Sequence, residues 1–353
     1  MTRQYDISAR ILKWYKRHGR DLPWRATKNP YHIWISEVML QQTQVETVIP
    51  YYQRFLTRFP TVETLAAASL QDVLKAWENL GYYARARHLH SAAKGIMART
   101  GGTIPANEKE LLRLPGIGAY TAAAILSIAF GQRVPAVDGN VRRVLCRLFG
   151  IRDPLEEIKT LRHIHELASD LVPVKSSSRF NQGLMDLGAT ICTPRKPSCG
   201  LCPVQESCLA FDLGLQDVLP VTRKRGALPH RQMTAGVLYD DLGRLLIVRR
   251  SLRGLLGGLW KFPGGEKGRG QSLKNSLVQE VHKELGIRVR VGEKITTVKH
   301  AYTHFRITLH AFRCSMKTGE PRAKKCHSWQ WIDPKNLADV PFSNVDRKIM
   351  ACL

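Results

Sequence analysis

Residues 111–131, LLRLPGIGAYTAAAILSIAFG, contain two apolar helical runs separated by the turn PGIG at 115–118. The spacing predicts a short helix, a tight turn and an alanine-rich helix that ends at Gly131. Gly116 and Gly118 permit tight backbone geometry and allow a close approach. Amides at the start of the second helix would then favour an anion such as a DNA phosphate. Taken alone, the stretch is better explained as an ordinary helical turn.

The length and charge of the chain limit the class of protein to which it can belong. At 353 residues it exceeds what one hydrophobic core normally organises, so two domains are expected. The 54 Lys and Arg outnumber the 29 Asp and Glu, which gives a formal charge of +25. This excess of positive charge indicates a polyanionic partner, either nucleic acid or a membrane surface. Because the longest apolar run (122–130) is too short to span a bilayer and the amino terminus lacks a signal-like stretch, we expect a cytosolic, nucleic-acid-binding protein.

Periodicity divides the chain into two kinds of structure. Apolar residues recur at helical spacing from Ile7 to about Leu213, and beyond the basic stretch 219–231 the pattern changes to short alternating runs. We therefore expect a multidomain protein with an all-α domain (1–216), a linker (217–231) and an α+β domain (232–353). Within the last, strands are predicted at 233–240, 244–250, 288–292, 304–314 and 328–333, with a helix at 272–285.

Half of the eight cysteines crowd into one loop, CTPRKPSCGLCPVQESC. In a reducing compartment such a cluster predicts a metal site rather than disulfides. Zinc and an iron-sulfur cluster both accept four thiolates, so spacing alone leaves both open. The ligands would be Cys192, Cys199, Cys202 and Cys208.

Glu37 is the single carboxylate within WISEVMLQQTQV (34–45). Its neighbours are apolar residues and uncharged amides, which would raise its pKa and keep it protonated. A solvent-facing position on an amphipathic helix is the alternative. It is weakened because Gln41 and Gln44 are expected one and two turns along the same face, as in a polar lining.

Asp138 stands immediately before a helical run in AVDGNVRRVLCRLFG (136–150). By itself it is most simply explained as a helix N-cap. A polar N-cap setting also suits an ionised carboxylate. Two acids in opposite protonation states could divide a bond cleavage, one protonating the leaving group and the other stabilising the positive charge left behind.

Together these motifs resemble the endonuclease III superfamily of base-excision DNA glycosylases, and within it the MutY-type adenine DNA glycosylases. The resemblance rests on LPGIGAYTA (114–122), VDGNVRRVL (137–145), LPWR (22–25) and LGYYARAR (80–87). It implies an all-α helix-hairpin-helix glycosylase domain with a [4Fe-4S] cluster on the four cysteines. It also implies that Glu37 protonates adenine N7 and that Asp138 is the ionised partner, with Tyr120 and Asn140 supporting the transition state.

Tyr120 bears on the type of reaction. By resemblance, superfamily members that also cleave the DNA strand carry a lysine there, because an amine is needed to form a Schiff base with the sugar. The phenol predicts a monofunctional glycosylase whose product is an abasic site. The remaining DNA contacts also follow by matching. Around the target adenine and the opposing base these are Trp24, Arg25, Leu40, Gln42, Thr43, Leu80, Tyr82 and Gln182.

The second domain resembles the Nudix fold. Counted from Gly265, the signature retains Glu280 and Glu284, whereas Gln271 and Lys283 replace carboxylates that hold Mg²⁺. We therefore expect a Nudix-like domain without hydrolysis. By resemblance it recognises 8-oxoguanine opposite the target adenine, through Tyr302, Thr303 and His304; an ordinary strand end is the alternative.

Three functions thus compete: an adenine glycosylase, a nucleotide pyrophosphohydrolase and a noncatalytic DNA-binding scaffold. The first needs Glu37, Asp138 and Tyr120 together, and the second needs an intact Nudix signature that this chain lacks. We expect a monomer in the bacterial cytosol. Its partner would be duplex DNA with 8-oxoguanine:adenine or guanine:adenine mispairs.

Overall fold

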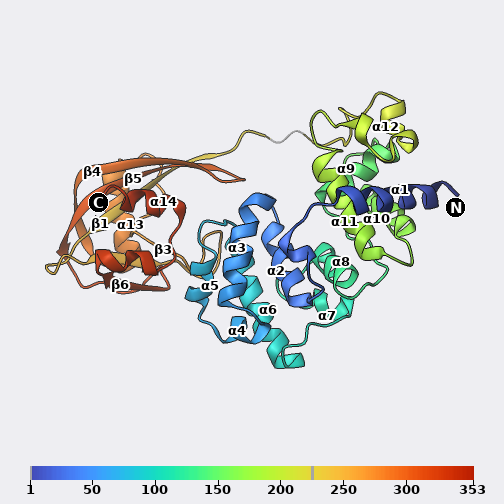
Figure 1. The fold of residues 1–353 in the computed structure, drawn as a ribbon. Helices are drawn as coiled ribbons and strands as arrows, with labels where there is room; N and C mark the ends of the chain where they lie inside the picture. The colour runs from blue at the N-terminus through green and yellow to red at the C-terminus, as the bar shows by residue number, and fades with distance from the viewer. Residues whose placement is uncertain (1, 224–225) are drawn as a thin grey trace. The chain divides into compact units, whose positions relative to one another are not determined.

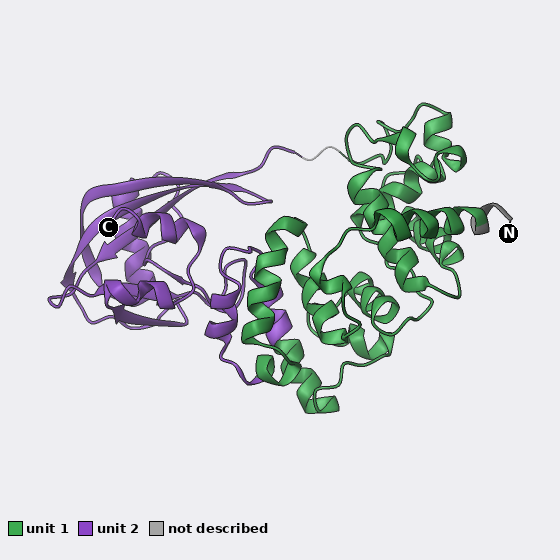
Figure 2. Cartoon of the chain, viewed as in Figure 1, with its two compact units in different colours: residues 1–66, 91–225 green, residues 67–90, 226–353 purple. Residues whose placement is uncertain are grey.

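The chain folds into two units, coloured green and purple in Figure 2. The computed structural model describes residues 2–223 and 226–353. Contacts group residues 1–66 with 91–225, and residues 67–90 with 226–353. The domain limits drawn from the sequence remain a prediction. By contacts, the segment 67–90 groups with the second unit, although the sequence analysis placed it in the helical domain. Residues 224 and 225 of the predicted linker lie outside the described residues.

The first unit is helical, as its 3.6-residue periodicity predicted (Figure 1). Two helices contain residues of both units: one runs from Val62 to Ala67 and the other from Ala84 to Thr100. The helices are α1 (Thr2–His18), α2 (Pro30–Leu40), α3 (Val45–Arg58), α4 (Val62–Ala67), α6 (Ala84–Thr100), α7 (Glu108–Leu112), α8 (Ala119–Ile128), α9 (Gly139–Leu148), α10 (Ile158–Leu171), α11 (Ser177–Thr190) and α12 (Leu209–Asp212), with short 3₁₀ turns η1 (Pro23–Arg25), η2 (Cys199–Leu201) and η3 (Gln205–Ser207).

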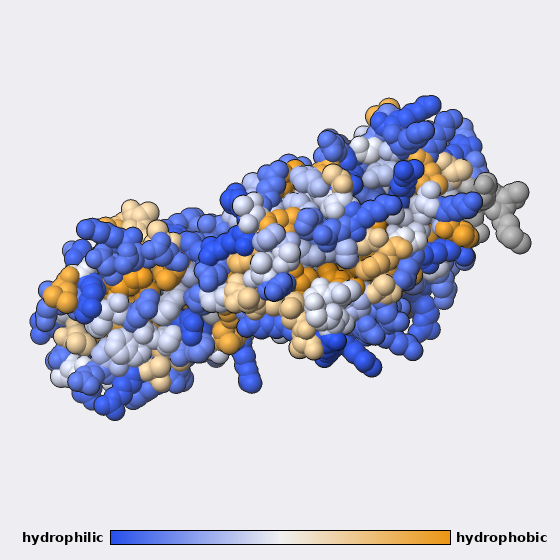
Figure 3. Space-filling model, turned by 60° about the horizontal axis from the view of Figure 1, so that its bottom comes forward, coloured by the Kyte–Doolittle hydropathy of each residue, from blue (hydrophilic) through white to orange (hydrophobic). Residues whose placement is uncertain are grey.

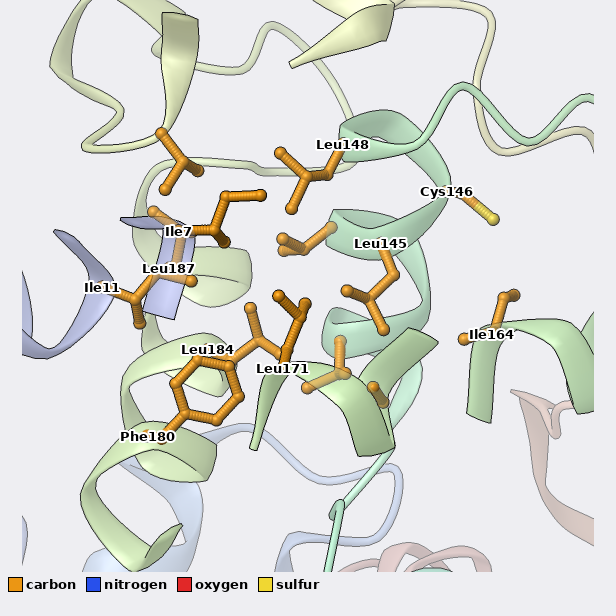
Figure 4. Packing of buried hydrophobic residues seen from close by; sticks show 14 of the residues in the cluster. Ile7, Ile11, Leu145, Cys146, Leu148, Ile164, Leu171, Phe180, Leu184 and Leu187 are labelled. Carbon is orange, nitrogen blue, oxygen red and sulfur yellow. The ribbon is translucent and has the colours of Figure 1, made fainter. Parts of the chain in front are cut away.

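One hydrophobic core holds α1, α9, α10 and α11 together (Figure 4). Side chains such as Ile11, Leu145, Ile164 and Phe180 are fully buried in it. Burial of each such side chain contributes about 1.5–3 kcal/mol. This core places the start of α9, where Asp138 lies, beside α11.

The helix α2 carries Glu37 and begins at a clear signal. Asn29 accepts hydrogen bonds from the amides of Tyr31 and His32, and Pro30 occupies the first turn. The helix ends at Leu40, and Gln42 has a left-handed backbone (φ 57°). Gln44 is the N-cap residue of α3, so it does not share a helical face with Glu37 and Gln41 as expected. Gln41 already leaves the helical conformation (ψ 111°), so the helix ends before that face can continue.

Two three-stranded sheets form the second unit, which is α+β as expected. The first has the order β1-β5-β4, with β1 parallel to β5 and β4 antiparallel to it; the second has the order β3-β2-β6. The elements are α5 (Leu70–Ala76), β1 (His230–Leu238), β2 (Leu245–Arg249), β3 (Trp260–Lys261), α13 (Leu273–Leu285), β4 (Arg288–Ala301), β5 (Arg306–Thr318), β6 (Ser328–Ile332), the 3₁₀ turn η4 (Pro334–Asp339) and α14 (Asn344–Met350).

The strand β4 is much longer than the predicted run 288–292. Most of its residues past Val291 are exposed or half-buried, so no apolar alternation marks them. Pairing with β5 continues to Ala301 through register shifts, which direct sequence reading cannot reveal.

Polar side chains predominate on the surface in Figure 3, and hydrophobic ones gather there in small groups. Among residues 2–223 and 226–353 we find no helix with the length and apolarity that crossing a bilayer requires.

Candidate active site

Glu37 lies at a cavity of about 960 Å³ within the first unit. Its side chain is only 5% exposed, on a helix that is buried nearly all round. The cavity joins the end of α2 to the first turns of α8 and α9 and to α11. Predicted site residues that line it are Trp24, Arg25, Glu37, Leu40, Gln42, Thr43, Gly118, Tyr120, Asp138, Asn140 and Gln182.

The hydroxyl of Tyr120 donates a hydrogen bond of 2.6 Å to Glu37 Oε2. Burial raises the pKa of Glu37 from its ordinary 4.5 to about 7. The hydrogen bond and the charge of Arg25 oppose that rise, whereas the charge of Asp138 adds to it. Burial also raises the pKa of Tyr120 well above 10, so the phenol keeps its proton. Glu37 therefore titrates near neutral pH.

Asp138 is the N-cap of α9. Its Oδ1 accepts from the amide of Val141 at 2.7 Å, and its Oδ2 accepts from Asn140 Nδ2 at 3.0 Å. Arg143 Nη2 in turn donates to Asn140 Oδ1 at 2.7 Å. Burial raises the pKa of Asp138 above its ordinary 3.8, and these hydrogen bonds oppose the rise. The arrangement fixes the carboxylate at the edge of the cavity that holds Glu37.

The loop after α2 also reaches the cavity. Gln41 Nε2 donates to Thr121 Oγ1 at 3.2 Å, which ties the loop to α8. Gln42 is exposed and left-handed, a conformation that is uncommon for residues other than glycine and that often marks functional loops. Gln182 accepts from Tyr15 Oη at 3.3 Å and donates to Ser178.

The two hairpin glycines differ in the structure. Gly116 has a positive φ of 79°, so the turn requires glycine there. Gly118 is extended (φ −93°) and serves as the N-cap of α8. A side chain at Gly118 would meet nothing within 4 Å, which leaves open space before the helix. The phosphate contact at both glycines remains a prediction.

Tyr82 belongs to the second unit, together with Tyr302, Thr303 and His304. These four residues line a cavity of about 220 Å³. The hydroxyls of Tyr82 and Thr303 share a hydrogen bond, and Tyr82 has a left-handed backbone. Leu80 is buried and lines neither this cavity nor that of Glu37.

The segment 67–90 is held to residues 226–353 by side-chain hydrogen bonds. Glu78 Oε1 accepts from Arg347 Nε at 2.7 Å and from the amide of Phe342 at 3.0 Å. Gln71 Oε1 accepts from Trp260 Nε1 at 2.8 Å. These contacts position Tyr82 beside Thr303, and sequence reasoning did not identify them.

The cysteine loop suits the cluster that the resemblance implies. Burial raises the pKa of the Cys202 thiol to about 12, and the other three thiols interact with it electrostatically. Arg147, which is buried, donates to Cys192 Sγ at 3.3 Å and to the carbonyl of Thr193 at 2.7 Å. Four neighbouring thiols in one loop beside a buried cation fit an anionic group held by thiolates. Arg147 was missed in the sequence, where it reads as part of an ordinary helix.

No three His, Cys, Asp or Glu side chains in the described ranges 2–223 and 226–353 are gathered closely enough to hold a single metal ion.

Lysines neutralise the two surviving Nudix carboxylates. Lys261 Nζ donates to Glu284 Oε2 at 2.9 Å and to the carbonyl of Gly264 at 2.5 Å. Lys283 Nζ donates to Glu280 Oε1 at 2.7 Å. Ammonium groups thus satisfy carboxylates that a hydrolase would offer to Mg²⁺. Lys261 could not be identified from the signature because it lies outside it.

Comparisons with known proteins agree with this geometry. Residues 35–192 match the HhH-GPD superfamily of base excision DNA repair proteins, residues 192–208 match the iron-sulfur binding domain of endonuclease III, and residues 234–352 match the NUDIX domain. The predicted fold class and the [4Fe-4S]-binding motif of Cys192, Cys199, Cys202 and Cys208 are thereby confirmed.

Relatives extend over nearly the whole chain. The adenine DNA glycosylase of Rattus norvegicus is 34% identical, over 98% of this chain and 78% of the relative. That of Buchnera aphidicola subsp. Acyrthosiphon pisum is 31% identical, over 98% of this chain and 97% of the relative. Among solved structures, a thermostable thymine-DNA glycosylase aligns with a TM-score of 0.55 and 33% identity, covering 60% of this chain and 98% of its own.

Proposed function

This chain belongs to the family of adenine DNA glycosylases, and from that premise we propose that it removes adenine mispaired with 8-oxoguanine or guanine in duplex DNA. The reaction is hydrolysis of the N-glycosidic bond, which leaves an abasic site. The observation that carries the proposal is the pairing of Glu37 and Asp138 at one cavity, with a tyrosine where a strand-cleaving relative needs a lysine.

Glu37 supplies the proton. Adenine departs poorly as an anion, so its N7 must be protonated as the bond breaks. With a pKa of about 7, the buried carboxyl is half protonated at neutral pH. The hydrogen bond from Tyr120 occupies Oε2, which leaves Oε1 to carry the proton to the base. The rate should therefore fall as the pH rises through 7.

Asp138 stabilises the positive charge that develops on the sugar. Asn140 and the amide of Val141 hold its carboxylate in place, so it need not reorganise during the reaction. Water then completes the hydrolysis at the sugar carbon. Stabilising the charge on the sugar requires ionised Asp138, so the rate should also fall at low pH. The dependence of the rate on pH should therefore be bell-shaped.

The proposed monofunctional reaction is tested on duplexes with a single 8-oxoguanine:adenine, guanine:adenine or adenine:thymine pair. We expect the strand that carried adenine in the two mispairs to break only after alkali. Borohydride should trap little covalent complex, because the phenol of Tyr120 cannot form a Schiff base. Glu37→Gln protein is the matched control and should yield no alkali-labile sites. Strong trapping, or cleavage without alkali, would contradict the monofunctional assignment.

Recognition of the opposing 8-oxoguanine falls to the second unit in this proposal. The hydroxyls of Tyr82 and Thr303 lie together at a cavity, with His304 beside them. Both hydroxyls and the imidazole can hydrogen-bond to the oxidised edge of the base. Extruding the adenine costs a few kcal/mol, least at a mismatch, which adds to selectivity.

Replacing Thr303 and His304 together by alanine should reduce the preference for 8-oxoguanine:adenine over guanine:adenine by roughly tenfold, since each lost hydrogen bond is worth about 0.5–1.5 kcal/mol. The ratio of single-turnover rates on the two duplexes measures this. Thr308→Ala is the control, because Thr308 is buried on β5 away from that cavity. An unchanged ratio would assign the loop a purely structural role.

The charge of the chain and its relatives support the proposed DNA partner and the proposed cellular compartment. The formal charge of +25 supplies affinity for the DNA backbone that should weaken steeply with salt. We propose a monomer acting in the bacterial cytosol, in keeping with the bacterial relative of similar length.

A further inference from the structure

Asp186 is a completely buried carboxylate next to the cavity of Glu37, and the proposed mechanism does not use it. It lies on α11 and has no exposed side-chain surface. Two arginines that line the cavity converge on it, Arg20 and Arg25. A buried, ionised carboxylate requires positively charged partners, so the cavity needs the two arginines in these positions.

The contacts form a clamp around Arg25. Arg25 Nη1 and Nη2 donate to Asp186 Oδ2 and Oδ1 at 2.6 and 2.8 Å, in the two-pronged geometry that favours arginine. Nη1 also donates to the carbonyl of Arg20 at 2.8 Å. The guanidinium lies over the ring of Tyr15 at 5.4 Å. Arg20 donates to the same carboxylate through its Nε at 2.8 Å and its backbone amide at 3.0 Å.

We propose that Asp186 is a positioning residue for adenine excision: it fixes the guanidinium of Arg25 at the cavity and offsets its charge, so that Glu37 stays a usable acid. This inference rests on the proposed function. Burial acts to raise the pKa of Asp186, but the two arginines outweigh it and hold that pKa below 3.8. The carboxylate is therefore ionised wherever Glu37 titrates.

The charges that face Glu37 make the direction of the effect clear. Tyr120 on α8 donates to it, Asp138 at α9 raises its pKa, and Arg25 at η1 lowers it. The other charged groups lining the cavity are Arg20, Arg142 and Arg143. If Asp186 lost its charge, Arg25 would act on Glu37 without compensation. The pKa of Glu37 would then fall, and Glu37 would cease to act as a proton donor at a lower pH.

The test measures single-turnover adenine release against pH on a duplex with one 8-oxoguanine:adenine pair. In Asp186→Asn, the amide cannot accept both guanidinium prongs and carries no charge. We expect the alkaline half-point to move down by about half to one pH unit. The loss of rate at pH 8.5 should then exceed the loss at pH 6 by about three- to fivefold.

Arg25→Gln and the double variant separate positioning from structure. Arg25→Gln removes the guanidinium charge that lowers the pKa of Glu37, so the alkaline half-point should move upward. In the double variant, Asp186→Asn should add no downward shift, so its half-point should match that of Arg25→Gln, because Asp186 then has no Arg25 to position. Thermal unfolding and the absorbance of the iron-sulfur cluster report whether each variant folds.

An equal loss of rate at every pH in Asp186→Asn, or a half-point unchanged in Arg25→Gln, would overturn the inference. If Asp186→Asn fails to fold, the half-point of Arg25→Gln decides alone. Failure of the wild-type protein to release adenine from any duplex would instead end the proposed function. The two failures are thus distinguishable.

Discussion

Replacing Glu37 by glutamine should reduce adenine release on the order of 10⁴-fold, the upper end of what general acid catalysis contributes. Glutamine keeps the shape of the side chain and can still accept the hydrogen bond from Tyr120. It has no acidic proton to give to adenine N7. Single-turnover kinetics measure the rate, and a gel-shift titration should show DNA binding within a few-fold of wild type. Retained turnover would remove Glu37 from the mechanism.

The same substitution should stabilise the protein at alkaline pH. The pKa of Glu37 is raised from 4.5 to about 7, so the folded state holds the proton more tightly than the unfolded state. The stability that this contributes is complete below pH 4.5 and is lost as the pH rises through 7. Glutamine does not ionise, so relative to wild type its variant should gain up to about 3 kcal/mol in free energy of unfolding by pH 8. Urea unfolding at pH 5 and pH 8 measures the difference.

Replacing Asp138 by asparagine should slow adenine release by about 10²–10³-fold, because one preorganised charge is lost at the developing cation. Asparagine caps a helix as well as aspartate does and can still accept from the amide of Val141, so α9 should keep its start at Gly139. The expected variant is therefore folded and nearly inactive. The measurement is again single-turnover release from the 8-oxoguanine:adenine duplex.

Asp138→Ala is the matched control for this prediction. It removes the charge and the cap together, and should cost about 1 kcal/mol of stability in addition to the same loss of rate. Equal activity in wild type and Asp138→Asn would show that Asp138 serves only as a cap.

Much of the fold followed from the sequence because its signals are local. The PGIG turn, the N-cap at Asp138 and the alternating runs near 233–250 each depend on neighbouring residues. The helical first unit and the α+β second unit appear accordingly. The strand β4 was underestimated because its exposed residues follow no apolar pattern, and only pairing with β5 defines it.

The candidate site was predictable where one motif carries one role, and not where partners are distant in sequence. Glu37, Tyr120 and Asp138 were expected together, and they line one cavity. Asp186 and Lys261 were not noticed, because their partners lie 161 and 23 residues away. A buried carboxylate within an apolar helix such as FNQGLMDLGA (180–189) is the one signal that could have directed attention to Asp186.

The pH dependence of adenine release by the wild-type protein tests the central claim most directly. On an 8-oxoguanine:adenine duplex with enzyme in excess, the rate should reach half its maximum near pH 7 on the alkaline side and fall tenfold for each further unit. A rate that stays constant from pH 6 to 9 would contradict the assignment of Glu37 as the acid that protonates adenine.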